Sequence, residues 1–257
     1  MARLGLFYMQ PLWDASMSTS EMRTLAEHTE TSICTLLREI NQEGAIQYDH
    51  QLIEYDEENI SSYDFFYYNG VSGDSESEVK IEYERLISQL YRRSAFLTIF
   101  GTFEYHLDKC LKKMLDISRS VEVRSNLNKG IPFRAHIILT TVIAAGTSTV
   151  IENIDHLRVI RNFIAHNNGF INGYSNLLNS DTRTAKEESV VLSIRKGIEA
   201  QVLSMDCFDE IFLNDSFLTY TVTEINRYIK QMSDAVEDYH QRHFTAVTTE
   251  NTPTATP

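Results

Sequence analysis

The longest helical pattern in the chain decides its class of fold. Residues 77–115 contain no proline, and in their second half large apolar side chains recur at every third or fourth position. This spacing predicts a long amphipathic helix with a continuous apolar stripe. The stripe consists of Phe96, Phe100, Phe103, Leu107, Cys110 and Met114. Other helices have to pack along such a stripe, and Gly101 lets one approach closely, so we predict a mainly α-helical bundle.

A second amphipathic helix is predicted around residues 150–166. Placed at about 100° per residue, its apolar side chains fall on one side: Val150, Ile154, Leu157 and Ile164. Arg161 falls on that same side, where it needs an anionic partner, because removing water from an ion costs several kcal/mol. The partner that we expect is Glu104, at the edge of the apolar stripe of the first helix. The alternative is that Glu104 is an exposed residue on the rim of its helix.

The opposite side of this second helix carries polar side chains. Asp155, Asn162 and His166 line up there, and Asn162 and His166 are neighbours because they are four residues apart. Residues 167–169, Asn-Asn-Gly, tolerate left-handed backbone, so the helix is expected to end directly after His166. The helix dipole favours a positively charged imidazole at this end.

Arginine, asparagine and histidine in this arrangement have the chemistry for RNA cleavage without a metal ion. RNA carries its own nucleophile in the 2′-hydroxyl group, which attacks the phosphorus once a base removes its proton. His166 would be the general base or acid, Arg161 would stabilise the pentavalent phosphate, and Asn162 would orient the phosphate or the imidazole. We expect no metal ion and no cofactor.

The segment RNFIAH, residues 161–166, resembles the signature of the HEPN superfamily, an arginine followed four to six residues later by a histidine. The resemblance implies an antiparallel helical bundle, and many members are endoribonucleases of toxin–antitoxin, anti-phage and CRISPR-associated systems. It also implies a homodimer in which two copies of the motif share one cleft. One branch, partnered by a nucleotidyltransferase antitoxin, has a tyrosine two residues after the histidine. Here that residue is Asn168, so regulation by AMP transfer is not expected.

The motif and the resemblance together predict a metal-independent endoribonuclease of the toxin or anti-phage defence type. Its substrate would be RNA, cut to a 2′,3′-cyclic phosphate at a composite site on a homodimer interface. An antitoxin or another defence protein would be its partner. The alternative is a noncatalytic RNA-binding, nucleotide-binding or assembly protein, in which Arg161 belongs to a buried network and His166 only ends its helix.

Charge is distributed unevenly along the chain, whose net charge is −13. Residues 18–85 hold 16 acidic and 4 basic residues, whereas residues 109–134 hold 7 basic and 2 acidic ones. Either both stretches are solvated faces, or the acidic one keeps RNA away from the basic one until it is displaced. The candidate RNA-binding residues are Lys109, Lys112, Lys113, Arg119, Asn167 and Asn168.

Three segments are predicted along the chain: an acidic N-terminal helical segment (1–76), a HEPN-like helical domain (77–244) and a disordered tail (245–257). Three further helices are predicted: one at 18–43, a short one at 133–145 and a last one from Asn214 or Asp215 to about Phe244. Ser148 or Thr149 is expected to cap the motif helix. Residues 172–189 are predicted to form a polar lid or linker, and residues 190–194 and 200–205 the two strands of a β-hairpin.

Cysteine usage and hydropathy indicate the compartment. Cys34, Cys110 and Cys207 lack the paired spacing of zinc ligands, which argues against zinc and disulfides and favours a reducing cytoplasm. No segment approaches the roughly 20 apolar residues of a membrane span, and Pro11 and Asp14 interrupt the apolar start that a secretory signal would need. We therefore expect a cytoplasmic protein without a membrane partner.

Overall fold

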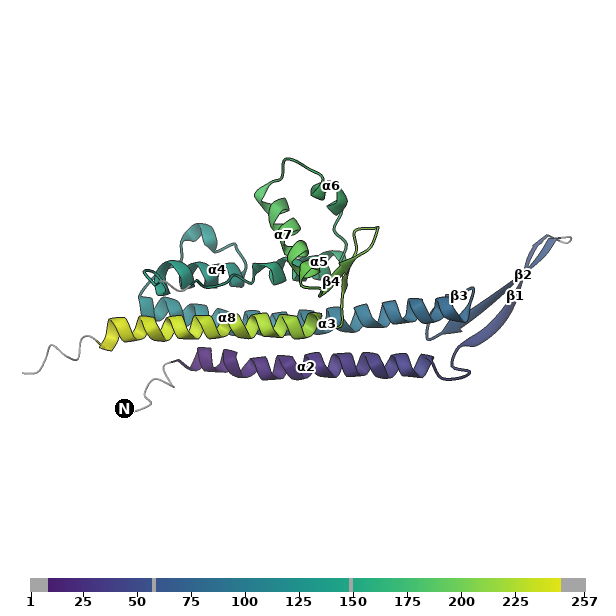
Figure 1. Cartoon of the computed structure of the whole chain (residues 1–257), viewed down its shortest axis with the longest axis horizontal. Coiled ribbons are helices and arrows are strands. Elements are labelled where there is room, and N and C mark those ends of the chain that lie inside the picture. Colours follow the sequence, from purple (N-terminus) through teal and green to yellow (C-terminus); the bar gives the residue numbers. More distant parts are fainter. Residues whose placement is uncertain (1–8, 57–58, 148–149, 246–257) are drawn as a thin grey trace, which may run out of the picture. The chain divides into compact units, whose positions relative to one another are not determined.

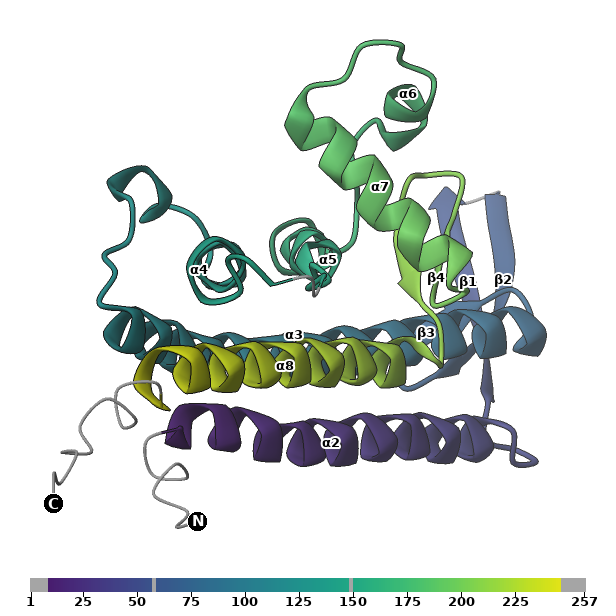
Figure 2. The ribbon, with the colours of Figure 1, turned by 60° about the vertical axis from the view of Figure 1, so that its left-hand side comes forward.

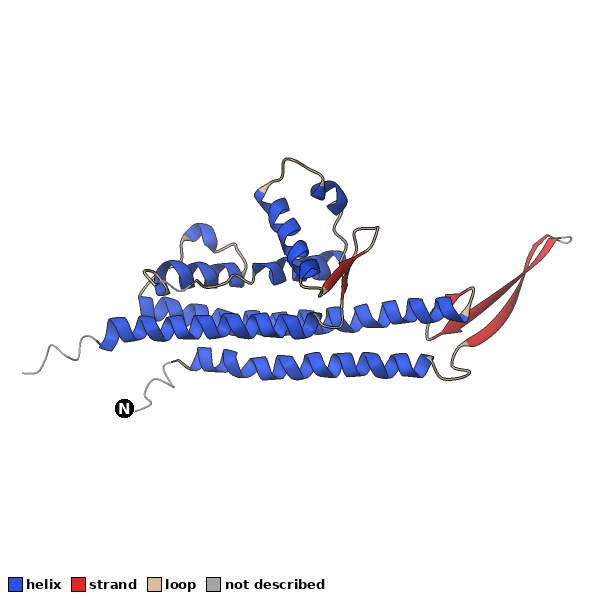
Figure 3. Cartoon of the chain, in the orientation of Figure 1, coloured by secondary structure: helices blue, strands red, loops and turns tan. Residues whose placement is uncertain are grey.

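The computed structural model describes residues 9–56, 59–147 and 150–245, and most of these residues are helical (Figures 1 and 3). The predicted mainly α-helical class is therefore confirmed. Among the described helices, none combines the length and the apolar character needed to cross a membrane. Nearly all of the predicted tail, from residue 246 onward, lies outside the described residues.

The chain forms two compact units. Unit 1 comprises Met1–Leu25 and Phe96–Pro257, and unit 2 comprises Ala26–Ala95. Two long helices, α2 (Gln10–Ile40) and α3 (Glu76–Ser118), each contribute residues to both units. The segment boundary predicted after residue 76 falls inside unit 2, at the start of α3.

The core of unit 1 is built on the apolar stripe of α3. All six predicted members of this stripe are buried, with at most 1% of each residue exposed. Helix α8 (Phe217–His240) lies along α3 (Figures 1 and 2), and the ring centroids of Phe96 and Phe217 are 4.9 Å apart in an edge-to-face contact. Phe103 and Tyr228 form a second such contact at 6.2 Å. Burying one side chain of this size stabilises the fold by about 1.5–3 kcal/mol, so these aromatic contacts hold α3 and α8 together.

Shorter helices lie on one side of the α3–α8 pair (Figure 2). They are α4 (Ile131–Ile138), the π-helical turn η2 (Leu139–Ile143), α5 (Asp155–Asn167), α6 (Tyr174–Leu178) and α7 (Ala185–Glu199), and two further turns are η1 (Arg124–Asn126) and η3 (Gln241–Thr245). Helix α4 together with η2 confirms the short helix predicted at 133–145. Helix α5, which carries the motif, packs against α7.

The first residues of two helices differ from the prediction. Helix α2 begins at Gln10 rather than Ser18, because Leu12 and Ala15 extend its buried face and Pro11 is compatible with a first helical turn. Helix α5 begins at Asp155, whose N–H donates to the Asn153 side chain at 2.8 Å. The caps predicted for α5, Ser148 and Thr149, lie outside the described residues.

The strand predicted at residues 190–194 is wrong, because these residues belong to α7. Thr184 and Glu187 form a capping box that starts this helix, and Val190 and Ile194 lie on its buried face, one turn apart. β-Branched residues favour strands locally. Here the capping box and the burial of one helical face outweigh that preference.

A β-hairpin does precede the last helix, but it consists of β4 (Leu203–Met205) and β5 (Ile211–Leu213). Gly197 in α7 lies against this hairpin so closely that a Cβ atom there would be 2.4 Å from Cδ1 of Leu203. Helix α8 then begins at Phe217, close to the predicted start at Asn214 or Asp215.

Unit 2 contains a three-stranded antiparallel sheet that the sequence pattern did not predict. The strands β1 (Gln47–Asp56), β2 (Asn59–Tyr68) and β3 (Val71–Gly73) are adjacent in that order. Asn69 and Gly70 have φ angles of 43° and 84°, which is the backbone of a tight hairpin turn between β2 and β3. One buried apolar cluster of this unit consists of Ile40, Val71, Val79 and Tyr83.

Candidate functional site

The end of helix α5 places the motif histidine. Asn168 takes the left-handed conformation at φ 48°, and the N–H of Gly169 donates to the carbonyl oxygen of Phe163 at 3.0 Å. This closes the helix as the sequence predicts. His166 therefore lies in the last turn of α5, where its side chain is exposed.

Arg161 is paired with Glu104, the partner expected from the sequence. Its Nη2 donates to Oε2 of Glu104 on α3 at 2.9 Å, and the side chains of Arg161 and Glu104 are 31% and 18% exposed. Nη1 of Arg161 donates to Oδ1 of Asn162 at 3.0 Å. The guanidinium thus joins a carboxylate on α3 to the amide of the next residue in the motif.

The face of α5 that carries Asn162 and His166 lines a cavity of about 920 Å³. Arg158, Asn162 and His166 follow one another at intervals of four residues, so they project to the same side of the helix. Segment 128–130 and Phe133 of α4 contribute to the lining, and so do residues from the first turns of α7.

The lining of this cavity is basic. Lys129, Arg158 and Lys186 belong to it, and among the described residues no aspartate or glutamate does. Arg158 donates from Nε and Nη2 to Asp155 at 2.5 and 2.9 Å, and this pairing raises the pKa of Arg158. Nζ of Lys129 lies 4.1 Å from the ring centroid of Phe133. The cavity is therefore suited to an anion.

Arg161 does not line this cavity, although the sequence analysis expected it to act on the same phosphate as His166. The two residues are five positions apart, which places them about 140° apart around the helix. Within one chain, Asn162 connects Arg161 to the cavity through the hydrogen bond described above.

The candidate RNA-binding residues of the basic stretch are not part of the cavity lining, whereas Asn167 is. Lys109 lies over the ring of Tyr105 at 4.1 Å. Lys112 and Lys113 form ion pairs within α3, with Asp108 at 2.5 Å and with Asp116 at 3.4 Å. Arg119 follows α3 with a φ of 52°, and Asn168 is the C-cap of α5.

The sequence pattern did not point to Arg158 or Lys186, and it included Lys129 only as one of the seven basic residues of 109–134. Arg158 could have been found, because it lies four residues before Asn162 and eight before His166 on the helical wheel. Lys186 gave no such signal, since its place in the site depends on how α7 packs against α5.

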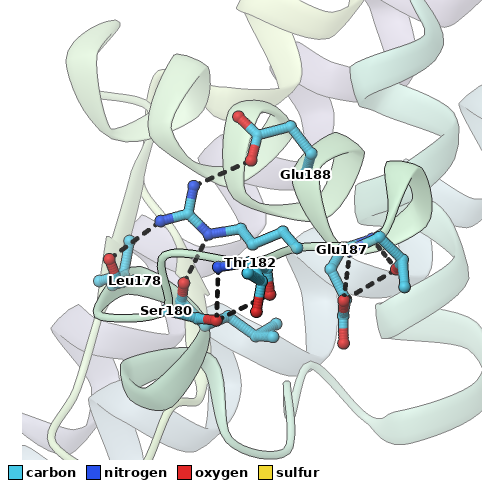
Figure 4. A network of polar contacts seen from close by, with 8 residues as sticks. Leu178, Ser180, Thr182, Glu187 and Glu188 are labelled. Atoms are coloured by element: carbon cyan, nitrogen blue, oxygen red, sulfur yellow. Dashed lines mark hydrogen bonds and ion pairs between the residues drawn. The ribbon is translucent and has the colours of Figure 1, made fainter.

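The segment that joins α6 to α7 leads into the first turn of α7, which carries Lys186, and a network of hydrogen bonds holds this segment (Figure 4). Arg183 is at the centre of this network. It donates to the carbonyl oxygens of Leu177 and Leu178 at 2.6 and 3.0 Å and to the Glu188 carboxylate at 2.9 Å. The capping box of α7 follows directly.

His156, the other histidine of α5, has a structural role. Nε2 of His156 is 2.9 Å from the Tyr220 hydroxyl, and only 7% of the residue is exposed. Burial lowers the pKa of His156 to about 3, so the imidazole is neutral. His156 is thus a core histidine whose hydrogen bond is satisfied.

The comparisons with known proteins add no relative: no family model, no curated protein and no solved structure matches the chain. Within the described residues, no group of three or more histidine, cysteine, aspartate or glutamate side chains is placed to hold a metal ion. Fold and site together define a mainly helical protein with a basic cavity at the C-terminal end of an amphipathic helix.

Proposed function

We propose that the chain is a metal-independent endoribonuclease of the toxin or defence type that acts as a homodimer. The observation that carries the proposal is the shared location of His166 and Asn162 in a cavity whose described lining has three basic residues and no acidic one, although Arg158 is paired with Asp155 beside it. Such a lining attracts a phosphodiester. It also places an imidazole, a side chain that can act as a general base or acid, beside the bound phosphate.

The proposed reaction uses the 2′-hydroxyl group of the RNA itself as the nucleophile. His166 accepts the proton of a 2′-hydroxyl group of the RNA while the 2′-oxygen attacks the adjacent phosphorus. The bond to the 5′-oxygen of the next nucleotide breaks, and that oxygen takes a proton from a second imidazole. The products are a 2′,3′-cyclic phosphate and a 5′-hydroxyl, and no water is consumed.

A second copy of the chain supplies what one chain lacks. The cavity holds one histidine, whereas the reaction uses both a base and an acid. Within one chain, Arg161 pairs with Glu104 and does not line the cavity. A two-fold arrangement of α5 helices, as the HEPN resemblance implies, brings a second His166 and a second Arg161 to the shared cleft.

One observation favours a noncatalytic role as the second candidate. Arg161 is held by Glu104 and Asn162 in a partly buried network, which is what a structural arginine in a binding or assembly protein would show. In that case the cavity binds an anion without cleaving it, and replacing His166 leaves every property except binding unchanged.

The purified full chain tests the proposal with end-labelled single-stranded RNA in excess chelator. We expect wild-type protein to cut the RNA and His166→Ala to lose at least about 100-fold in rate, the size of a general-base contribution. His28→Ala, which replaces an exposed histidine of α2, is the matched control and should cut normally. Equal cleavage by the wild type and His166→Ala, or an intact RNA in every lane, would contradict the proposal.

A further inference from the structure

The polar groups that face the cavity and still have hydrogen-bonding capacity include three cationic donors and one amide donor. Arg158 uses Nε and Nη2 on Asp155, which leaves Nη1 for a ligand. Asn162 accepts from Arg161 through Oδ1, which leaves its Nδ2 amide for a ligand. The ammonium groups of Lys129 and Lys186 can only donate. These groups match a ligand made of acceptors, as the oxygens of a phosphodiester are.

The two lysines approach the cavity from different elements. Lys129 comes from the segment before α4, and Lys186 comes from the first turn of α7. Both residues are exposed. Two cations from separate elements can each contact a different phosphate of one strand.

The cavity also offers an apolar surface. Phe133 and Phe163 line it, together with Val159 and Val190. A volume of about 920 Å³ lies at the upper end of the range for small-molecule sites, so a base can enter with its sugar. A base in a duplex is stacked on its neighbours, whereas an unpaired base presents a free face to an aromatic side chain.

We propose that this cavity binds one unpaired nucleotide of an RNA strand and thereby selects single-stranded substrates. Lys129, Lys186 and Nη1 of Arg158 hold the two flanking phosphates, and the base lies against the ring of Phe163. The proposal deepens the proposed ribonuclease function, on which it rests for the choice of RNA, because the bound nucleotide is adjacent to His166.

The test measures binding without cleavage. The probe is a short fluorescein-labelled 2′-O-methyl oligouridylate, which lacks the free 2′-hydroxyl and cannot be cut. Its affinity for the full chain is measured by fluorescence anisotropy over a series of salt concentrations. The variants are Lys129→Ala, Lys186→Ala and Phe163→Leu, and the matched control is Lys230→Ala, an exposed lysine on α8 that is not part of the cavity lining.

Each cavity lysine that contacts a phosphate contributes about 0.7 to the slope of log affinity against log salt for a single strand. Lys129→Ala and Lys186→Ala should therefore each weaken binding and lower this slope by about 0.7, whereas Lys230→Ala should leave affinity and slope as in the wild type. Phe163→Leu should weaken binding about 10-fold at an unchanged slope, because stacking does not depend on salt in the same way.

The results separate this inference from the proposed function. Wild-type slopes in both lysine variants, or equal affinity for a duplex of the same length, would overturn the inference even if the protein cuts RNA. Lysine-dependent binding of the uncut probe together with intact natural RNA would support the nucleotide site and refute the nuclease.

Discussion

The ion pair between Arg161 and Glu104 gives the sharpest prediction about stability. Replacing Glu104 with glutamine keeps the volume and one acceptor of the side chain but removes its charge. Exposed ion pairs contribute about 0–1 kcal/mol, whereas breaking a fully buried pair costs about 3–5 kcal/mol. With side chains 18% and 31% exposed and an N–O distance of 2.9 Å, this pair lies between those limits. Glu104→Gln should lower the free energy of unfolding by about 1–2 kcal/mol.

Urea unfolding followed by circular dichroism measures this change. At roughly 2–4 °C for each kcal/mol, the thermal midpoint should also fall by about 2–8 °C. The control is Glu82→Gln, which breaks the exposed pair of Glu82 with Arg85, whose side chains are 44% and 46% exposed. That variant should lose less than about 0.5 kcal/mol. If Glu104→Gln costs no more than the control, Arg161 does not depend on Glu104 and the reasoning about the motif helix fails.

Three further predictions concern other parts of unit 1. Burial lowers the pKa of His156 from its ordinary value of 6.5 to about 3, so only the unfolded chain binds this proton between those values. Its contribution to stability is therefore complete above pH 6.5 and is lost as the pH falls toward 3, by up to about 1.4 kcal/mol per pH unit. Urea titrations at several pH values should show a shallower dependence for His156→Gln, and an unchanged dependence would refute the assignment. Gly197→Ala should cost about 1–3 kcal/mol in urea unfolding, because its Cβ would meet Leu203 at 2.4 Å. A neutral result would mean that α7 and β4 are less closely packed. Arg183→Met removes the hydrogen bonds that hold the segment between α6 and α7, so limited proteolysis should cut there faster than in the wild type, whereas equal rates would show that the network does not restrain this segment.

The helical core could be predicted because its signal is periodic and local. Residues at three- and four-residue spacing from Phe96 to Met114 are all buried on α3. The ion pair of Arg161 with Glu104 could also be predicted, since a charge on an apolar face requires a partner and Glu104 lies at the edge of the facing stripe. The first argument needs one helix at a time, and the second needs only that the two helices pack together.

Other features depend on contacts that no local pattern contains. The run of β-branched residues at 190–194 favours a strand, and the capping box of Thr184 with Glu187 together with packing against α5 makes it helical. Apolar and polar residues alternate only weakly along β1 and β2, because aromatic side chains lie on both faces of β2. Tyr63 and Phe65 stack at 6.0 Å on one face, and Tyr68 packs against Tyr83 on the other. The place of Lys186 in the cavity likewise follows from tertiary packing.

The central claim is that the chain cuts RNA through the strand's own 2′-hydroxyl group with His166 as the base. The most direct measurement is the mass of the fragments that the wild-type protein releases from a defined single-stranded RNA in excess chelator. The account predicts an upstream fragment that is one water lighter than a linear phosphate, paired with a downstream fragment that begins with a 5′-hydroxyl. A linear 3′-hydroxyl with a 5′-phosphate, or full-length RNA alone, would contradict it.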